Sequence, residues 1–347
     1  MRLSHEEALD LFRSHDLVGL GMAADQLRRQ RHPENVVTYQ IDRNINYTNI
    51  CTEYCSFCAF YRPPGAADGY LLPLETICEK IDEMLTMGGT GILMQGGLHP
   101  DLKIDYYENL LCSLKARYPT LHLHCFSAPE MINIAELSGL SVRDTIARLR
   151  DAGLDSIPGA GAEILDDEVR RRISRLKCTT AEWIDVHRTA HQLGLRTTAT
   201  MMFGCGESLE NRVNHFETLR RIQDETGGFT AFIPWMFQPE NTPLGRKIKE
   251  PATAVDYLKT LAISRLYFDN IDNVQASWLT PGLKICQVAL RFGANDVGSI
   301  IIEENVVFAA GCKNRTSESE LRRIIRDAGF IPVQRDHLYR TYFLRYN

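Results

Sequence analysis

The sequence predicts an α/β fold, a (β/α)8 TIM-type barrel with an N-terminal helical cap and a short C-terminal extension. From residue 45 onward, apolar runs typical of buried strands alternate with segments of helical spacing. Strands separated by helices imply right-handed crossovers and a parallel sheet. Eight such units over about 260 residues have the size of a complete barrel of this kind.

Residues 1–43 are expected to form a cap and a lead-in strand rather than a separate domain. A capping-box pattern from Ser4 to Glu7 opens a first helix. A second helical stretch covers residues 21–30, and residues 36–41 resemble a short strand.

Residues 44–306 are expected to form the barrel. Behind Pro73, residues 74–85 carry apolar side chains at helical spacing, and a capping box at Thr179 opens a helix that ends near Gly194. Residues 300–303 could equally continue a loop in place of the eighth strand. The expected strands are residues 45–50, 91–94, 121–126, 156–157, 196–202, 230–235, 274–277 and 297–301.

Residues 307–347 are expected to form the C-terminal extension, a helix and a tail. Ser317 and Glu320 form a further capping box ahead of an apolar helical pattern. The chain then ends in a basic, aromatic run over residues 335–347.

The composition of the 347 residues narrows the class of protein. The formal net charge of −5 argues against a nucleic-acid or membrane-surface partner. No stretch of about 18 apolar residues is present, and the first residues are too polar for a signal peptide. Seven of the ten cysteines are scattered singly. Reduced thiols in the cytoplasm explain this pattern better than disulfides do.

Three cysteines, Cys51, Cys55 and Cys58, stand within eight residues after the first expected strand. Thiolates this close together can bind one metal centre. A [4Fe–4S] cluster has four iron atoms to ligate, so three cysteines leave one iron open. Structural zinc is the alternative, but it needs a fourth ligand at short spacing, usually as a second pair, and none follows Cys58 in that way.

The spacing C-x3-C-x2-C resembles that of radical S-adenosylmethionine (SAM) enzymes. The resemblance implies a [4Fe–4S] cluster and SAM as cofactors, with the amino and carboxylate groups of SAM on the open iron. The cluster then supplies one electron that splits SAM and releases a 5′-deoxyadenosyl radical. The alternative from another class is an electron-transfer module without SAM, but such ferredoxins normally carry four cysteines for each cluster.

Other candidate site residues follow later strands, because a barrel of this type has its active site at the C-terminal strand ends. Gly96 and Gly97 follow the second strand and allow close backbone approach to a ligand. The resemblance implies that they contact SAM, so that a side chain at Gly97 weakens SAM binding without loss of iron. Glu163 follows the fourth strand and could bind the SAM ribose or ammonium, or simply be a solvated carboxylate at a helix start.

Three further residues are expected to fill the barrel. His122 and His124 alternate with leucines on one strand and therefore share one of its faces. A metal role would need a third ligand, so satisfied core imidazoles are the better interpretation. Cys205 is expected to be a small apolar residue near the site and not a cluster ligand.

A narrower resemblance covers residues 36–338. The strings at residues 44–49, 58–62, 158–163 and 239–242 resemble the futalosine-pathway and deazaflavin branch of radical SAM enzymes. Within it, residues 42–47, 61–65, 229–235 and 302–306 resemble the dehypoxanthine futalosine cyclases. Aminofutalosine synthases are the nearest alternative, followed by deazaflavin (FO) synthases.

This resemblance implies cyclisation of dehypoxanthine futalosine in menaquinone biosynthesis. The deoxyadenosyl radical removes the ribose C4′ hydrogen, and the carbon radical adds to the benzoate ring. The ring regains its aromaticity when one proton and one electron leave. An electron donor such as flavodoxin or ferredoxin is the expected partner.

Five residues are candidates for the substrate chemistry. Arg62 is expected to bind the benzoate carboxylate, because guanidinium pairs with it through two hydrogen bonds, although a structural ion pair is an equal alternative. Asn241 and Thr242 are candidates for the sugar hydroxyls. Glu303 and Glu304 are candidates for the base, with a solvated pair as the alternative.

Overall fold

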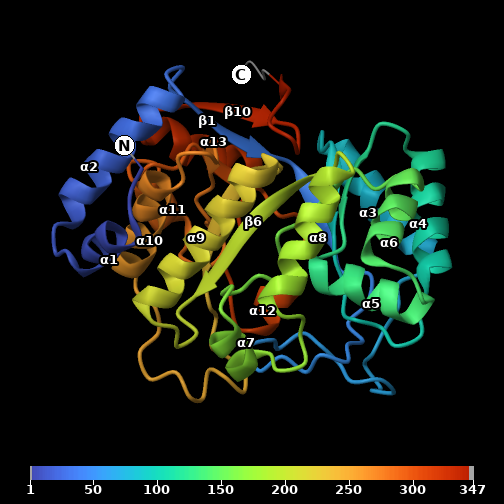
Figure 1. Ribbon diagram of the computed structural model, residues 1–347. Coiled ribbons are helices and arrows are strands. Elements are labelled where there is room, and N and C mark those ends of the chain that lie inside the picture. The colour runs from blue at the N-terminus through green and yellow to red at the C-terminus, as the bar shows by residue number, and fades with distance from the viewer. Residues whose placement is uncertain (1, 344–347) are drawn as a thin grey trace.

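Seven parallel strands form the larger sheet of the structure, a computed structural model that describes residues 2–343 (Figure 1). The strands follow one another around the sheet in chain order, and each pairs in parallel with the next. They are β2 (Asp42–Ile45), β3 (Gly91–Met94), β4 (His122–Cys125), β5 (Ser156–Ile157), β6 (Arg196–Phe203), β7 (Phe229–Met236) and β8 (Asn273–Val274).

Helices cover the outside of this sheet, because parallel neighbours need long crossover connections. The capping box at Thr179 and the apolar spacing behind Pro73 are both confirmed as helix starts. The helices are α3 (Leu74–Thr86), α4 (Ile104–Arg117), α5 (Ala128–Ser138), α6 (Val142–Asp151), α7 (Asp167–Ile173), α8 (Thr180–Gln192), α9 (Leu209–Thr226), α10 (Ala254–Tyr267) and α11 (Leu283–Ala289).

The barrel is closed by the eighth expected strand, β9 (Asp296–Ser299). On one side, the amide of Ala276, just beyond β8, donates to the Asp296 carbonyl over 2.8 Å. On the other side β9 pairs in parallel with β1 (Val36–Gln40), which leads into β2 through Ile41. The (β/α)8 prediction is confirmed, with its last strand shared between the barrel and a second sheet.

That second sheet joins the two ends of the chain in the order β11-β10-β1-β9. The lead-in strand β1 pairs in parallel with β10 (Ile331–Arg335), and β11 (Tyr342–Phe343) pairs with β10 in the antiparallel direction. The expected C-terminal tail is therefore partly a strand, although residues 344–347 lie outside the described residues. The remaining helices are α1 (His5–Arg13), α2 (Leu17–Arg31), α12 (Val306–Ala309) and α13 (Glu318–Asp327).

The first barrel strand ends five residues earlier than the sequence predicts, at Ile45 instead of Ile50. The polar side chains beyond it bind neighbouring loops instead of continuing the sheet. The Asn46 amide donates to the Gln95 carbonyl over 3.2 Å, and the Asn49 amide donates to the Asp68 carbonyl over 3.0 Å. The segment from residue 46 to the cysteines therefore forms part of the site's rim.

Polar side chains extend through the inside of the barrel, from the cavity toward the N-terminal ends of the strands. His122 and His124 both contact the Ser156 hydroxyl, at 2.7 and 2.6 Å, which confirms their expected role as satisfied core residues. His337, from the C-terminal extension, stacks on the His122 ring with 4.7 Å between ring centres. Within residues 2–343, no helix has both the length and the apolar character needed to cross a membrane.

Candidate active site

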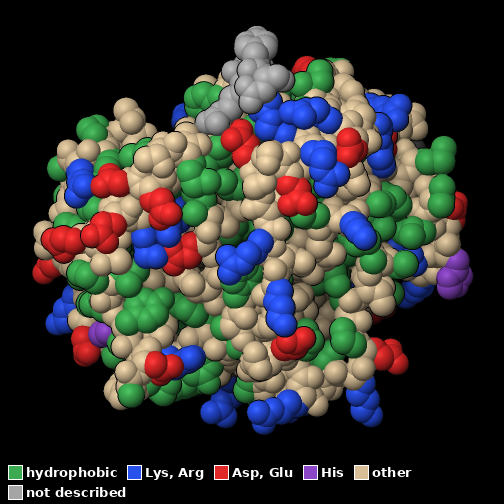
Figure 2. Space-filling view, turned by 180° about the vertical axis from the view of Figure 1, so that it is seen from behind, with side chains coloured by type: hydrophobic (Ala, Val, Ile, Leu, Met, Phe, Trp, Pro, Cys, Tyr) green, Lys and Arg blue, Asp and Glu red, His purple; other side chains and the backbone are tan. Residues whose placement is uncertain are grey.

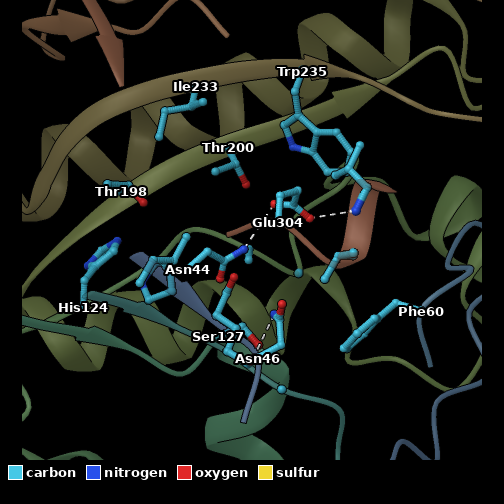
Figure 3. Close-up of a pocket in the computed structure, with 18 of the residues that line it drawn as sticks. Asn44, Asn46, Phe60, His124, Ser127, Thr198, Thr200, Ile233, Trp235 and Glu304 are labelled. Carbon is cyan, nitrogen blue, oxygen red and sulfur yellow. Dashed lines mark hydrogen bonds between the residues drawn. The ribbon is translucent and has the colours of Figure 1, made fainter. Parts of the chain in front are cut away.

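A cavity of about 430 Å³ occupies the barrel and opens at the C-terminal strand ends. Its lining includes the three motif cysteines, both glycines after β3, Glu163 and Glu304. Side chains from β2, β4, β6 and β7 point into it, as the labelled residues of Figure 3 show. The cysteine motif and the strand ends thus meet in one chamber, as the fold class predicts.

The cysteine loop is anchored at both ends and in the middle. Cys51 and Cys55 are buried, and Cys58 is half-buried. The Cys51 amide donates to the Arg62 carbonyl over 2.9 Å, and the Ser56 amide donates to the Ile173 carbonyl over 2.9 Å. All ten cysteines are free, so no disulfide competes for the three thiols.

These three cysteines fit an iron–sulfur cluster better than a single metal ion. Among residues 2–343, no three His, Cys, Asp or Glu side chains are close enough together to hold one ion. A four-iron cube keeps its thiolate ligands farther apart than one ion does. Burial raises the pKa of both Cys51 and Cys55. Thiolates there need the positive charge of bound metal.

Gly96 and Gly97 line the cavity, but their own chain explains why they are glycines. A Cβ atom on Gly97 would lie 2.2 Å from the Ile50 carbonyl oxygen and 2.8 Å from the Cβ atom of Cys51. A Cβ atom on Gly96 would lie 2.7 Å from the Tyr47 ring. The turn after β3 therefore packs directly against the start of the cysteine loop. The sequence predicts only that these glycines let a ligand approach the backbone.

This contact changes the expected effect of a side chain at Gly97. The variant Gly97→Ala is expected to lose iron together with SAM binding, because the new methyl group displaces Ile50 and Cys51. Gly65→Ala, in the same loop as Cys51, is the control for backbone strain alone, since φ there is +82° and a Cβ atom meets nothing within 4 Å. Iron content after anaerobic reconstitution is the measurement. Full iron content with weakened SAM binding would instead show that Gly97 acts only by letting SAM approach the backbone.

Glu163 lies in the cavity beside two cations that the sequence did not reveal. Lys177 donates to its Oε1 atom over 3.1 Å, and the Arg170 guanidinium lies 3.8 Å from Oε2. Oε2 accepts no hydrogen bond from the described residues, although it is buried. It can therefore accept one from a ligand, which supports the predicted role of Glu163 without testing it.

Arg62 is placed differently from the prediction. Its side chain does not line the cavity; it folds back over its own loop. The guanidinium pairs with Asp68 at 2.5 Å and donates to the carbonyls of Phe60 and Tyr61 at 3.1 and 3.0 Å. The alternative of a structural ion pair describes this position, and carboxylate binding does not.

Asn241 and Thr242 also lie outside the cavity lining. The Asn241 amide donates to the Ala309 carbonyl over 3.0 Å. The Thr242 hydroxyl donates to the Pro239 carbonyl and accepts the Gly245 amide, both over 2.9 Å. These bonds shape the turn after β7, and binding of sugar hydroxyls remains a prediction that the geometry does not support.

The two candidate bases separate clearly. Glu303 does not line the cavity and is held by two cations, with Lys80 Nζ at 2.5 Å and an Arg43 nitrogen at 2.8 Å. Hydrogen bonds from these cations outweigh burial and lower the pKa of Glu303. A carboxylate stabilised in this way is a poor proton acceptor.

Glu304 points into the cavity (Figure 3). It accepts the Val307 amide over 2.8 Å at the start of α12 and the Asn44 side-chain amide over 3.2 Å. Burial raises the pKa of Glu304 despite these bonds, which act in the opposite direction. Glu304 is therefore the one of the two that geometry and basicity favour as a base.

Several lining residues were missed from the sequence. Asn44 of β2 and Asn46 just beyond it both line the cavity, as Thr198 and Thr200 of β6 do (Figure 3). Polar residues two apart in a buried strand point into the barrel together, and this spacing was an available signal. Trp235 of β7 also lines the cavity, and its indole N–H has no partner among the described residues.

Comparison with known proteins agrees with this site. The model of the Radical SAM superfamily matches residues 45–219, and that of the CofH/MqnC C-terminal region matches residues 226–345. A cyclic dehypoxanthine futalosine synthase of Halalkalibacterium halodurans is 50% identical over 97% of this chain and 91% of that protein. A 5-amino-6-(D-ribitylamino)uracil–L-tyrosine 4-hydroxyphenyl transferase of Methanothermobacter thermautotrophicus is 44% identical over 97% of this chain and 94% of that protein.

The fold has solved counterparts as well. The crystal structure of a methylornithine synthase superposes with a TM-score of 0.76 over 96% of this chain and 94% of that chain, at 20% identity. This likeness concerns the fold, whereas the family model and the relatives concern the sequence itself. By its sequence the chain belongs to the radical SAM superfamily, whose enzymes use a [4Fe–4S] cluster and SAM.

Proposed function

We propose that this enzyme cyclises dehypoxanthine futalosine, joining the ribose C4′ atom to the benzoate ring within one molecule. The observation that carries the proposal is the 50% identity to a cyclic dehypoxanthine futalosine synthase along almost the whole chain. When bound, the cluster and SAM supply the radical that removes the C4′ hydrogen. Cys51, Cys55 and Cys58 would hold the cluster, and Gly96, Gly97 and Glu163 would bind SAM.

The cavity suits a substrate with sugar hydroxyls and an aromatic ring. Asn44 is buried, and its Oδ1 atom accepts no hydrogen bond from the described residues. A buried acceptor without a partner costs about 1–3 kcal/mol, and a substrate hydroxyl at this atom removes that cost. Trp235 and Phe60 both line the cavity and offer aromatic contacts for the ring (Figure 3).

Glu304 is the proposed acceptor of the proton that leaves the ring when aromaticity returns. Its carboxylate faces the cavity beside Asn44, so the sugar hydroxyl and the proton acceptor lie on one side of the substrate. The enclosing barrel keeps water and other hydrogen donors from the radical. A one-electron acceptor takes the remaining electron, and the same type of carrier, flavodoxin or ferredoxin, supplies the first.

The compartment and the pathway follow from the same proposal. An enzyme with ten free cysteines and an oxygen-sensitive cluster suits the reducing cytoplasm. Its product is an intermediate of menaquinone biosynthesis.

Turnover with isotope-labelled substrate tests the function. With SAM and dithionite, the protein is expected to convert dehypoxanthine futalosine to a product two hydrogens lighter. Deuterium at ribose C4′ should appear in 5′-deoxyadenosine, because the adenosyl radical breaks that bond. The enolpyruvyl substrate of aminofutalosine synthases is the comparison. Its turnover with loss of carbon dioxide, and no turnover of dehypoxanthine futalosine, would contradict the proposal.

A further inference from the structure

Positively charged side chains gather on the face of the protein next to the cysteine loop. They come from two segments, the end of α7 with the residues after it and the turn after β7. Figure 1 places α7 at the lower end of the molecule, and Lys and Arg side chains stand out along the lower edge of Figure 2. The exposed cations of this basic face are Arg171, Arg172, Arg175, Arg246, Lys247 and Lys249.

Both segments touch the loop between two of the cluster cysteines. The Ser56 amide and hydroxyl both donate to the Ile173 carbonyl at the end of α7, over 2.9 and 2.7 Å. The Ser56 carbonyl accepts the amide of Leu244, at the start of the second segment, over 2.8 Å. The basic face therefore borders the cluster site directly and from two sides.

Five of the six cations of this face make no ion pair or hydrogen bond within the described part of the protein. The sixth, Arg172, donates to the Gly206 carbonyl over 2.6 Å. Three exposed carboxylates, Glu168, Glu240 and Glu250, stand in the same segments, against six exposed cations. The whole chain carries a net charge of −5, so an excess of positive charge here is local.

Helix electrostatics explain only part of this arrangement. Arginines in the last turn of α7 interact favourably with the helix dipole. Residues 246–249 belong to no helix, so that stabilisation does not apply to them. Leu176 lies among the cations and is 54% exposed, which adds an apolar contact to the charged face.

We propose that this basic face is the docking surface for an acidic one-electron carrier protein such as a flavodoxin. The proposal rests on the proposed function, since the cluster must be reduced from outside before SAM is split. The carrier loses one electron and the cluster gains one, with no bond or proton exchanged. Opposite charges on the two surfaces speed encounter by about 10- to 1,000-fold at low salt and orient the carrier toward the cysteine loop.

Charge reversal tests the surface. The double variant Lys247→Glu/Lys249→Glu is compared with Arg143→Glu/Arg326→Glu, which reverses two exposed charges on α6 and α13, outside the basic face. Binding of a bacterial flavodoxin is measured by calorimetry with cluster-loaded and cluster-free protein. Cluster reduction by reduced flavodoxin is followed by absorbance. We expect both to weaken at least tenfold in the first variant only, and wild-type binding to weaken with salt.

Reduction by dithionite distinguishes a failure of the docking proposal from a failure of the proposed function. Both variants should be reduced by dithionite at the wild-type rate, because a small reductant needs no docking surface. Equal flavodoxin binding by the two variants, or binding of a nucleic acid in place of flavodoxin, would overturn the docking proposal. Failure of dithionite-reduced wild-type protein to convert dehypoxanthine futalosine would instead contradict the proposed function and leave the binding result as measured.

Discussion

Replacing Cys51, Cys55 or Cys58 with alanine is expected to abolish the iron–sulfur cluster in each case. Each thiol lines the same cavity, and no other cysteine or histidine of the loop can take its place. A cluster with only two protein ligands on its four irons is not retained through purification. The measurement is iron and sulfide content after anaerobic reconstitution, together with the thiolate-to-iron absorbance.

Matched controls come from cysteines elsewhere in the fold. Cys205 and Cys286 are fully buried thiols that stand alone, and Cys205 lies 3.2 Å from Glu207. Cys178 is half-buried, close to Arg170. Alanine at any of the three should leave the iron content unchanged. If Cys205→Ala loses iron while Cys55→Ala keeps it, the ligand assignment is wrong.

The structure brings the three cysteines together in the cavity and turns Arg62 away from it, and both placements have one physical explanation. Cluster ligands that lie within eight residues need only a loop to bring them together, so their spacing is visible in the sequence. Arg62 lies in the same loop, but its direction depends on Asp68 and on carbonyls that the loop turns toward it. Spacing does not determine which side of a loop a long side chain takes.

The cavity residues on the strands were difficult to predict for a different reason. Asn44, Thr200 and Trp235 face the cavity because of the register of β2, β6 and β7 in a closed ring. Apolar alternation does not show which of the two sets faces inward, since both sets are buried in a barrel covered by helices, so only the spacing of polar residues could have shown it. Lys177 was missed for a related reason: it reaches Glu163 from a loop beyond α7.

Glu304→Gln is expected to slow product formation about a hundredfold or more, because a positioned base typically contributes 10²–10⁴-fold. Glutamine keeps the shape of the side chain and an oxygen that can accept the Val307 amide, so α12 and the fold should persist. Formation of 5′-deoxyadenosine should be much less affected, since hydrogen removal from C4′ precedes proton loss from the ring. The ratio of 5′-deoxyadenosine to product should therefore rise.

The pH dependence gives a second readout for Glu304. The base works only when ionised, and burial raises the pKa of this carboxyl above its ordinary value. Product formation in the wild type should therefore fall as the pH falls through this raised pKa, at a higher pH than for an exposed glutamate. In Glu304→Gln, product formation should no longer fall at low pH in this way. Glu303→Gln is the matched control, because Glu303 lies outside the cavity and pairs with Lys80 and Arg43. Glu303→Gln should lower the Tm, while its product formation should still fall at low pH as in the wild type. An equal loss of 5′-deoxyadenosine and product in Glu304→Gln would instead make Glu304 a substrate-binding residue.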